Sequence, residues 1–143
     1  MATPTRNEVE AILLRWLAGI RARDLAGPAE LVSPDCVIES ISGAGLSGRE
    51  GIKHLYGDWI NAFPDVAVHA QETLVDGDRG VLVLMMAGTD SGGFMGLPPT
   101  GRSFWLSAVI VFTIADGLIV RYKSIYDFTG MLVQVGILKA KPA

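Results

Sequence analysis

Two aspartates stand out among the residues that could do chemistry. Asp90 follows an apolar run and precedes a glycine-rich segment, and Asp127 ends the last predicted strand beside Tyr126 and Phe128. A carboxyl group next to apolar surface loses solvation of its charged form, so its pKa should rise, and a raised pKa suits a general acid or base near neutral pH. Each residue also has an ordinary explanation: Asp90 suits a turn, and Asp127 suits the N-cap of a following helix.

Other chemical motifs are missing from the sequence, which contains no Walker A loop, no G-x-G-x-x-G after a strand and no G-x-S-x-G elbow. The two histidines, His54 and His69, lack metal-ligand spacing, and His69 lies in a predicted strand from which it could line a site. The one cysteine, Cys36, cannot form an internal disulfide and is expected to be buried. We therefore expect neither a metal site nor a serine or cysteine hydrolase.

The composition describes one domain, residues 1–143, with more apolar residues than a single core needs. Hydrophobic residues make up 50% of the chain, charged residues 19%, and the mean hydropathy is +0.38. No apolar run reaches the length of about 18 residues that a membrane span needs, no apolar signal segment opens the chain, and the net charge of −3 offers no basic surface for nucleic acid. We expect a cytoplasmic protein that binds neither membranes nor nucleic acid, with the apolar surplus in a cavity or an oligomer interface.

The predicted helices gather in the first half of the chain and the strands in the second. Capping boxes, Thr5 with Glu8 and Ser47 with Glu50, open two helices that continue as apolar stripes, and Pro28 suits the first turn of a short helix between them. Strands are expected at residues 36–40, 66–75, 79–89, 103–114 and 118–126, with a short helix or packed tail at 128–138. This order indicates an α+β fold, and helices laid over a strongly bent sheet would enclose a cavity.

Four segments resemble motifs of the SnoaL-like polyketide cyclase family. Residues 88–102 (GTDSGGFMGLPPTGR) resemble that family's G-T-H-x-G-x-F-x-G-I-P-P-T-G-R segment, with Asp90 in the place of the His. Residues 112–119 (FTIADGLI) are similar to F-R-x-x-D-G-K-I, and residues 127–136 (DFTGMLVQVG) to D-x-x-G-L-L-x-Q-L-G. The start of the third helix, residues 48–52 (GREGI), is similar to G-x-x-G-I.

This resemblance implies an NTF2-like, or ketosteroid isomerase-like, cone: a curved antiparallel or mixed sheet covered by three helices of the N-terminal half, around an apolar pocket. It also implies that Asp127 is the acid/base residue of an intramolecular aldol cyclisation or isomerisation, without metal or cofactor, on a small hydrophobic ketone. The carboxylate would remove a proton between two carbonyls, and the enolate would attack a second carbonyl held close to it. A homodimer through the outer face of the sheet is expected as well.

Further residues are candidates for the site. The candidate catalytic supports are Asp90, Tyr56, Tyr126 and His69. The two tyrosines are included because a Tyr hydroxyl can donate to an oxyanion. The loop at residues 92–102 is long for a hairpin connection and is expected to cover the pocket as a lid. The residues expected to line the pocket are Trp59, Met85, Phe94, Met95, Leu97, Pro98 and Trp105.

The sequence leaves two other functions open. One is a noncatalytic module of the same fold that binds a hydrophobic ligand or dimerises. The other is an epoxide-hydrolase-like enzyme, whose Asp-Arg-Asp set around a water could be assembled from Asp90, Arg121 and Asp127. Because side chains alternate along a strand, Arg121, Lys123 and Asp127 should share one face, so the facing of the last strand discriminates among these functions.

Overall fold

The computed structural model describes residues 3–139, so residues 1–2 and 140–143 of the expected domain lie outside the described residues. The first helix, α1 (Arg6–Arg21), begins at the predicted capping box, in which Glu8 N donates to Thr5 Oγ1 at 3.2 Å and Thr5 N donates to Glu8 Oε2 at 3.0 Å. Its predicted apolar stripe is buried from Val9 to Leu17, and Ile20 at the end of the stripe is half-buried. The sequence therefore fixes both where this helix starts and which side packs inward.

Two more helices precede most of the sheet: α2 (Ala26–Glu30) and α3 (Gly48–Ala62). The second predicted capping box is wrong, because the side chain of Ser47 makes no cap hydrogen bond. The backbone of Ser47 instead forms an isolated antiparallel bridge with Val37, which keeps the residue extended before α3. The apolar stripe of α3 alone is thus enough to bury the helix.

Five strands form one mixed sheet in the order β1-β5-β4-β3-β2. The strands are β1 (Val32–Glu39), β2 (Ala67–Asp76), β3 (Arg79–Thr89), β4 (Ser103–Ala115) and β5 (Leu118–Tyr126). Strand β1 pairs with β5 in parallel, and the other neighbours are antiparallel. Strand β1 starts at Val32, earlier than the predicted residue 36, because residues 33–35 lie within a register irregularity of the strand.

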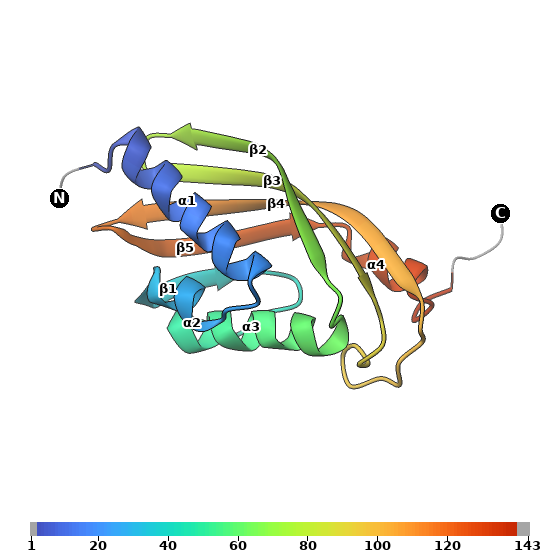
Figure 1. Ribbon diagram of the computed structural model, residues 1–143. Helices are drawn as coiled ribbons and strands as arrows, with labels where there is room; N and C mark the ends of the chain where they lie inside the picture. The colour runs from blue at the N-terminus through green and yellow to red at the C-terminus, as the bar shows by residue number, and fades with distance from the viewer. Residues whose placement is uncertain (1–2, 140–143) are drawn as a thin grey trace.

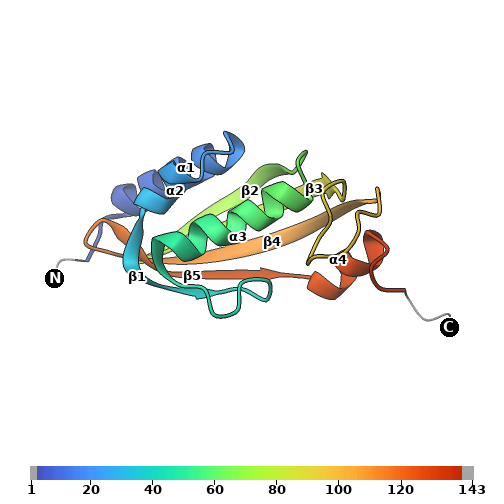
Figure 2. The same ribbon diagram turned by 90° about the horizontal axis from the view of Figure 1, so that it is seen from below.

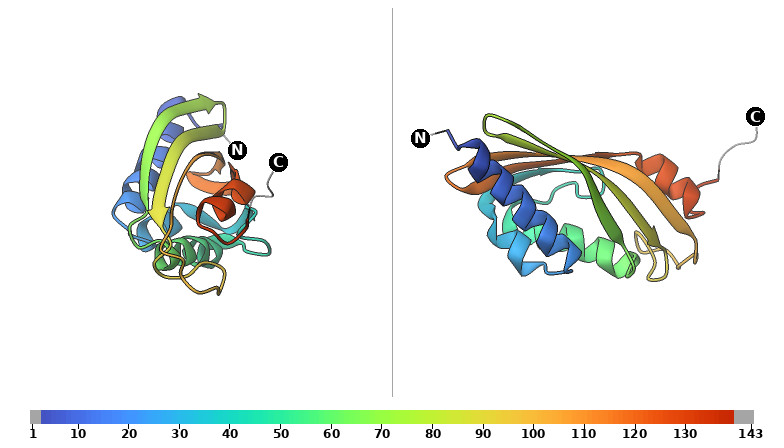
Figure 3. Two further views of the ribbon diagram at one scale, coloured as in Figure 1. Left: turned by 90° about the vertical axis from the view of Figure 1, so that its right-hand side faces the viewer. Right: turned by 45° about the horizontal axis from the view of Figure 1, so that its top comes forward.

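The sheet curves around its helix-covered face. Figure 1 shows α1 crossing the strands and α3 lying beside β1, and Figure 2 shows both helices on the same side of the sheet. Strands β2 to β4 bend toward the end of α3, as both views of Figure 3 make clear. Alternate residues of β4 and β5 point to this inner face, and Phe112 and Tyr122 are buried there. The expected α+β cone with three helices over one face is confirmed.

The last helix, α4 (Phe128–Gln134), docks against β4 beyond the end of its pairing with β5. Gln134 Oε1 accepts from Trp105 N at 2.8 Å, and Gln134 Nε2 donates to Trp105 O at 3.0 Å. The amide therefore replaces the strand partner that β4 lacks at this point, which satisfies backbone groups at the sheet edge.

The glycine-rich loop after β3 packs against the end of α3. Gly92 N donates to Ala62 O at 3.1 Å, and a Cβ atom at position 92 would lie 1.7 Å from Asn61 O. Only glycine allows the two backbones to approach so closely. No helix among residues 3–139 has the length and apolar character needed to cross a membrane.

Candidate functional site

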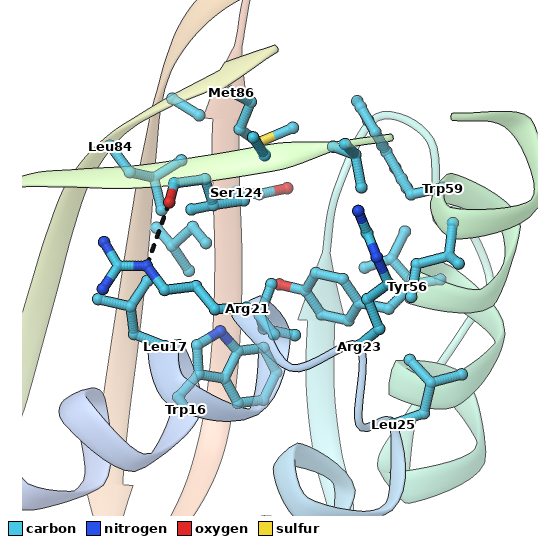
Figure 4. Close-up of a pocket in the computed structure, with 18 of the residues that line it drawn as sticks. Trp16, Leu17, Arg21, Arg23, Leu25, Tyr56, Trp59, Leu84, Met86 and Ser124 are labelled. Atoms are coloured by element: carbon cyan, nitrogen blue, oxygen red, sulfur yellow. Dashed lines mark hydrogen bonds between the residues drawn. The ribbon is translucent and has the colours of Figure 1, made fainter. Parts of the chain in front are cut away.

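An apolar cavity of about 440 Å³ lies between the inner face of the sheet and the helices. Its volume lies in the range of small-molecule sites, about 300–1,000 Å³. Figure 4 shows its walls coming from α1, α3 and the strands. The apolar side chains that line it include Trp16, Leu17, Leu55, Trp59, Leu84, Met86, Ala108 and Ile110.

Two tyrosines form the polar centre of this cavity. Tyr56 on α3 and Tyr122 on β5 bring their hydroxyl oxygens to 2.6 Å, and the edge of Trp16 packs against Tyr56 with ring centroids 5.4 Å apart. Burial raises the pKa of Tyr56 well above its usual value, and the neighbouring Tyr122 raises it further. Burial also raises the pKa of Tyr122. Both hydroxyls therefore stay protonated at neutral pH and can donate hydrogen bonds.

A second polar group borders the same cavity near Ser42. The Tyr126 hydroxyl donates to Ser42 Oγ at 2.8 Å, and Trp59 Nε1 donates to the same atom at 3.4 Å. Tyr126 is thus a cavity residue, but its proton is committed to Ser42. Burial raises the pKa of Tyr126, and the hydrogen bond with Ser42 partly offsets this effect.

The exposed lining residues define the mouth of the cavity, and they carry its charges. They are Arg21, Arg23, Asp24, Asp65, Ala67 and His69. The backbone N–H of Thr89 donates to Asp65 at 2.7 Å and lowers the pKa of that carboxyl. His69, a predicted supporting residue, borders the rim on edge strand β2, but it pairs with Met85, so the alternation of the strands turns its side chain toward the outer face of the sheet.

Asp127, the predicted acid/base residue, is exposed and is not among the residues that line the cavity. Its Oδ1 accepts from Gly130 N at 2.8 Å, so the carboxylate caps α4. The alternation along β5 explains this placement: Tyr122 is buried on the inner face, while Arg121, Lys123 and Asp127 are exposed. The expectation that Asp127 reaches the pocket is corrected, and the ordinary capping role is what the geometry supports.

Asp90 is fully buried but likewise lies outside the cavity lining. Its carboxylate accepts from Gly93 N at 3.1 Å and from Thr100 N and Oγ1 at 3.2 Å each, which ties together the two ends of the glycine-rich loop. The Asp-Arg-Asp set of an epoxide-hydrolase-like site is not assembled. Arg121 pairs with Glu39 on the outer face and lies six residues, about 20 Å of strand, from Asp127.

The predicted pocket residues divide among three places. Trp59 lines the main cavity, and it also borders a second pocket with Phe94 and Met95. Leu97 and Pro98 are exposed in the loop and line neither pocket. Met85 and Trp105 lie on the outer face of the sheet, because they alternate with the inward-facing Leu84 and Leu106. The loop therefore covers the second pocket rather than the main cavity.

Sequence reasoning missed Trp16, Tyr122 and Ser124. Trp16 belongs to the first helical stripe, where a core position and a cavity position look the same. Tyr122 and Ser124 had a usable signal: they share the parity of Tyr126 and alternate with the charged residues of the strand. Within residues 3–139, no three His, Cys, Asp or Glu side chains gather in a way that could hold a metal ion.

A cone of this shape, enclosing an apolar cavity with a few polar groups, defines the NTF2-like and ketosteroid isomerase-like class of folds. A family model described as SnoaL-like polyketide cyclase matches residues 10–135. The chain therefore belongs to the SnoaL-like polyketide cyclase family. A search of curated protein sequences finds no match.

Solved structures agree with this assignment. IdmH from Streptomyces antibioticus, a proposed polyketide cyclase, is 30% identical, with a TM-score of 0.75 over 89% of this chain and 97% of its own. AclR from Streptomyces galilaeus, a proposed hydroxylase, is 28% identical, with a TM-score of 0.81 over 96% of this chain and 87% of its own. A protein of ketosteroid isomerase-like fold from Catenulispora acidiphila is 18% identical, with a TM-score of 0.75 over 99% of this chain and 100% of its own, and supports the fold alone.

Proposed function

We propose that this chain binds a hydrophobic, ketone-bearing ring compound of the polyketide type and promotes a cofactor-independent aldol cyclisation or isomerisation of it. The observation that carries the proposal is the pair of tyrosine hydroxyls, 2.6 Å apart, in an otherwise apolar cavity. Family membership supports the class of substrate, and IdmH and AclR show that relatives of similar sequence are assigned both to cyclisation and to other reactions.

The hydroxyl pair can stabilise negative charge on a carbonyl oxygen. One hydroxyl must donate to the other, which leaves a single proton of the pair free for a ligand. The internal hydrogen bond polarises the second hydroxyl and strengthens its donation. A donor fixed in an apolar site stabilises a developing enolate oxygen much more than the same donor in water. Tyr56 and Tyr122 are the groups we assign to this role, and Tyr122 replaces Tyr126 as the partner.

Proton transfer needs an acceptor on the cavity lining. His69 is turned to the outer face by its pairing with Met85, and Asp65 already accepts the backbone N–H of Thr89. Asp24 uses only Oδ1 for backbone N–H groups, so we assign its carboxylate as the acceptor. It would take a proton from the carbon between two carbonyls, the enolate carbon would bond to a second carbonyl carbon, and the carboxylic acid would return the proton to the new alkoxide.

The outer face of the sheet supports the expected homodimer as a second part of this proposal. Trp105 is 59% exposed, Ile125 51% and Leu74 52%, and all three lie on that face. An apolar surface of this kind is typical of a protein interface. Ile125→Lys should turn a dimer into a monomer in light scattering, whereas Leu14→Lys, which changes an equally exposed residue on α1, should not.

The chemical proposal is tested with a polycyclic ketone that carries a β-dicarbonyl side chain, whose ring closure changes its absorbance. Tyr56→Phe and Tyr122→Phe should each lower the rate of closure roughly 10²-fold, the usual loss for one oxyanion donor. Tyr126→Phe removes a hydroxyl from the same cavity and should lower it only a few-fold. Asp24→Asn should slow closure strongly, and Asp58→Asn, on the solvent side of α3, should not.

Equal losses for all three tyrosine variants would refute the role of the hydroxyl pair. Binding of the ketone with no closure in the wild-type protein would refute the enzyme and support the noncatalytic binding module. Loss of activity in Asp58→Asn as well as Asp24→Asn would show that the carboxylate effect is indirect.

A further inference from the structure

The mouth of the cavity carries two arginines that the proposed chemistry does not use. Arg21 ends α1, and Arg23 follows two residues later. Figure 4 shows the two side chains extending from the end of α1 in different directions, Arg21 toward Leu84 and Arg23 toward Trp59. Arg21 Nε donates to Val68 O at 3.2 Å, the dashed line in Figure 4, and this bond leaves the terminal nitrogens for another partner. Neither arginine forms an ion pair with any residue between 3 and 139.

The two carboxylates at the mouth do not cancel these charges through direct contact. Asp24 Oδ1 accepts from Ala26 N at 3.1 Å and from Gly27 N at 3.2 Å, so it caps the start of α2. Asp65 accepts from Thr89 N, and Arg23 acts on it only through a weaker charge interaction. His69 also borders the rim. Both carboxylates are thus held toward backbone N–H groups, while the guanidinium groups keep free donors.

Arg23 occupies a backbone position where glycine is the usual residue. Asp24 N donates to Gly19 O and Arg23 N donates to Ile20 O, the two hydrogen bonds of a Schellman motif at the end of α1. Arg23 has φ 57°, in the left-handed region that a residue with a Cβ atom adopts at an energetic cost. A strained backbone that holds a side chain at the rim of a cavity points to a role for that side chain in binding.

We propose that Arg21 and Arg23 bind an anionic group, such as a carboxylate, at one end of a ligand whose apolar rings fill the cavity. Guanidinium groups form charge-assisted hydrogen bonds with carboxylates and other oxyanions. The walls offer no comparable partner for a charge, because apart from the tyrosine and serine hydroxyls they are apolar. This inference rests on the proposed function, and it specifies the substrates as amphiphiles that keep the anionic end at the mouth.

The test compares three ligands with the same rings: anthraquinone-2-carboxylate, its uncharged methyl ester and anthraquinone-2-sulfonate. The dissociation constants are measured by calorimetry for the wild type, Arg21→Gln, Arg23→Gln and the double variant. Arg15→Gln is the matched control, since Arg15 is an exposed arginine of α1 that does not line the cavity. We expect the wild type to bind the carboxylate about tenfold or more tightly than the ester, with a preference that weakens as salt rises.

In the double variant the ratio of ester to carboxylate dissociation constants should fall to near one, while the affinity for the ester stays the same. Equal affinity of the wild type for carboxylate and ester would overturn the proposal, and so would a preference that survives in the double variant or is lost in Arg15→Gln. Tight sulfonate binding would show that the site selects any oxyanion, and weak sulfonate binding that it selects carboxylates; both outcomes support an anion site. Failure of every ligand to bind would instead refute the proposed function.

Discussion

The strain at Arg23 predicts that Arg23→Gly stabilises the fold while it weakens anion binding. The left-handed conformation costs a residue with a Cβ atom about 1–2 kcal/mol. Glycine loses about 0.5–1 kcal/mol more conformational entropy on folding, which offsets part of the gain. The net expectation is a stabilisation of roughly 0.5–1 kcal/mol, because Arg23 lies at φ 57° and its hydrogen bonds within the Schellman motif use only backbone atoms.

Arg23→Ala is the comparison that separates the backbone from the charge. It removes the same guanidinium group but keeps the strained conformation. In differential scanning calorimetry, Arg23→Gly should melt about 2–4 °C above Arg23→Ala, since a change of 1 kcal/mol shifts the Tm of a domain of this size by about that amount. Both variants should lose the same share of the preference for anthraquinone-2-carboxylate over its ester.

Two results would refute this reasoning. A Tm of Arg23→Gly at or below that of Arg23→Ala would mean that the left-handed backbone carries no strain that glycine relieves. An unchanged carboxylate preference in both variants, with the expected difference in Tm, would mean that the strain is real but that the arginine side chain has no part in binding. Stability and binding are therefore tested separately by one pair of variants.

Three further predictions concern groups outside the anion site. Asp127→Ala should lower the free energy of unfolding by about 1 kcal/mol in urea titrations, because it removes the N-cap of α4, and should leave ring closure unchanged below the Tm; a large loss of rate would restore Asp127 as a catalytic residue. The pKa values of Tyr56 and Tyr122 are raised on folding, so their contribution to stability should be complete below about pH 10 and should decline as the pH rises toward the folded-state values; a flat stability between pH 9.5 and 11 would contradict this. Burial raises the pKa of Cys36 to about 11, so its thiol should react with a disulfide reagent at pH 8 only at the rate of unfolding, and fast reaction of the native protein would contradict its burial.

The elements of this fold follow closely from local patterns. The stripe and capping box of α1 and the bounds of β3 and β5 agree with the sequence predictions, because short-range hydrogen bonds and alternation determine them. Ser47 shows the limit of such local signals. A hydroxyl three residues before a Glu can form a capping box, but the bridge between Ser47 and Val37 keeps this one extended.

The site is harder to predict because alternation does not say which face is inner. Arg121, Lys123 and Asp127 share a face as expected, but only their pairing with the rest of the sheet puts that face outside. An Asp at the end of a strand and the start of a helix suits both a catalytic base and an N-cap, and only the backbone path decides between them. The outer face of β3 and β4 is also apolar, so hydrophobicity could not separate Met85 and Trp105 from cavity residues.

The internal pairing of the polar groups determines where a ligand can gain affinity and selectivity. No buried side-chain nitrogen or oxygen among the described residues lacks a hydrogen-bond partner, so the unliganded cavity carries little polar strain. Ser42 is already bonded to Tyr126 and Trp59, and the Tyr56–Tyr122 pair has one spare proton. A ligand therefore gains affinity from apolar contact with the walls and from hydrogen bonds to their few hydroxyls, neither of which distinguishes well between polycyclic ketones. Because the free charged donors lie at the mouth, selectivity among such compounds should depend on what each one places there.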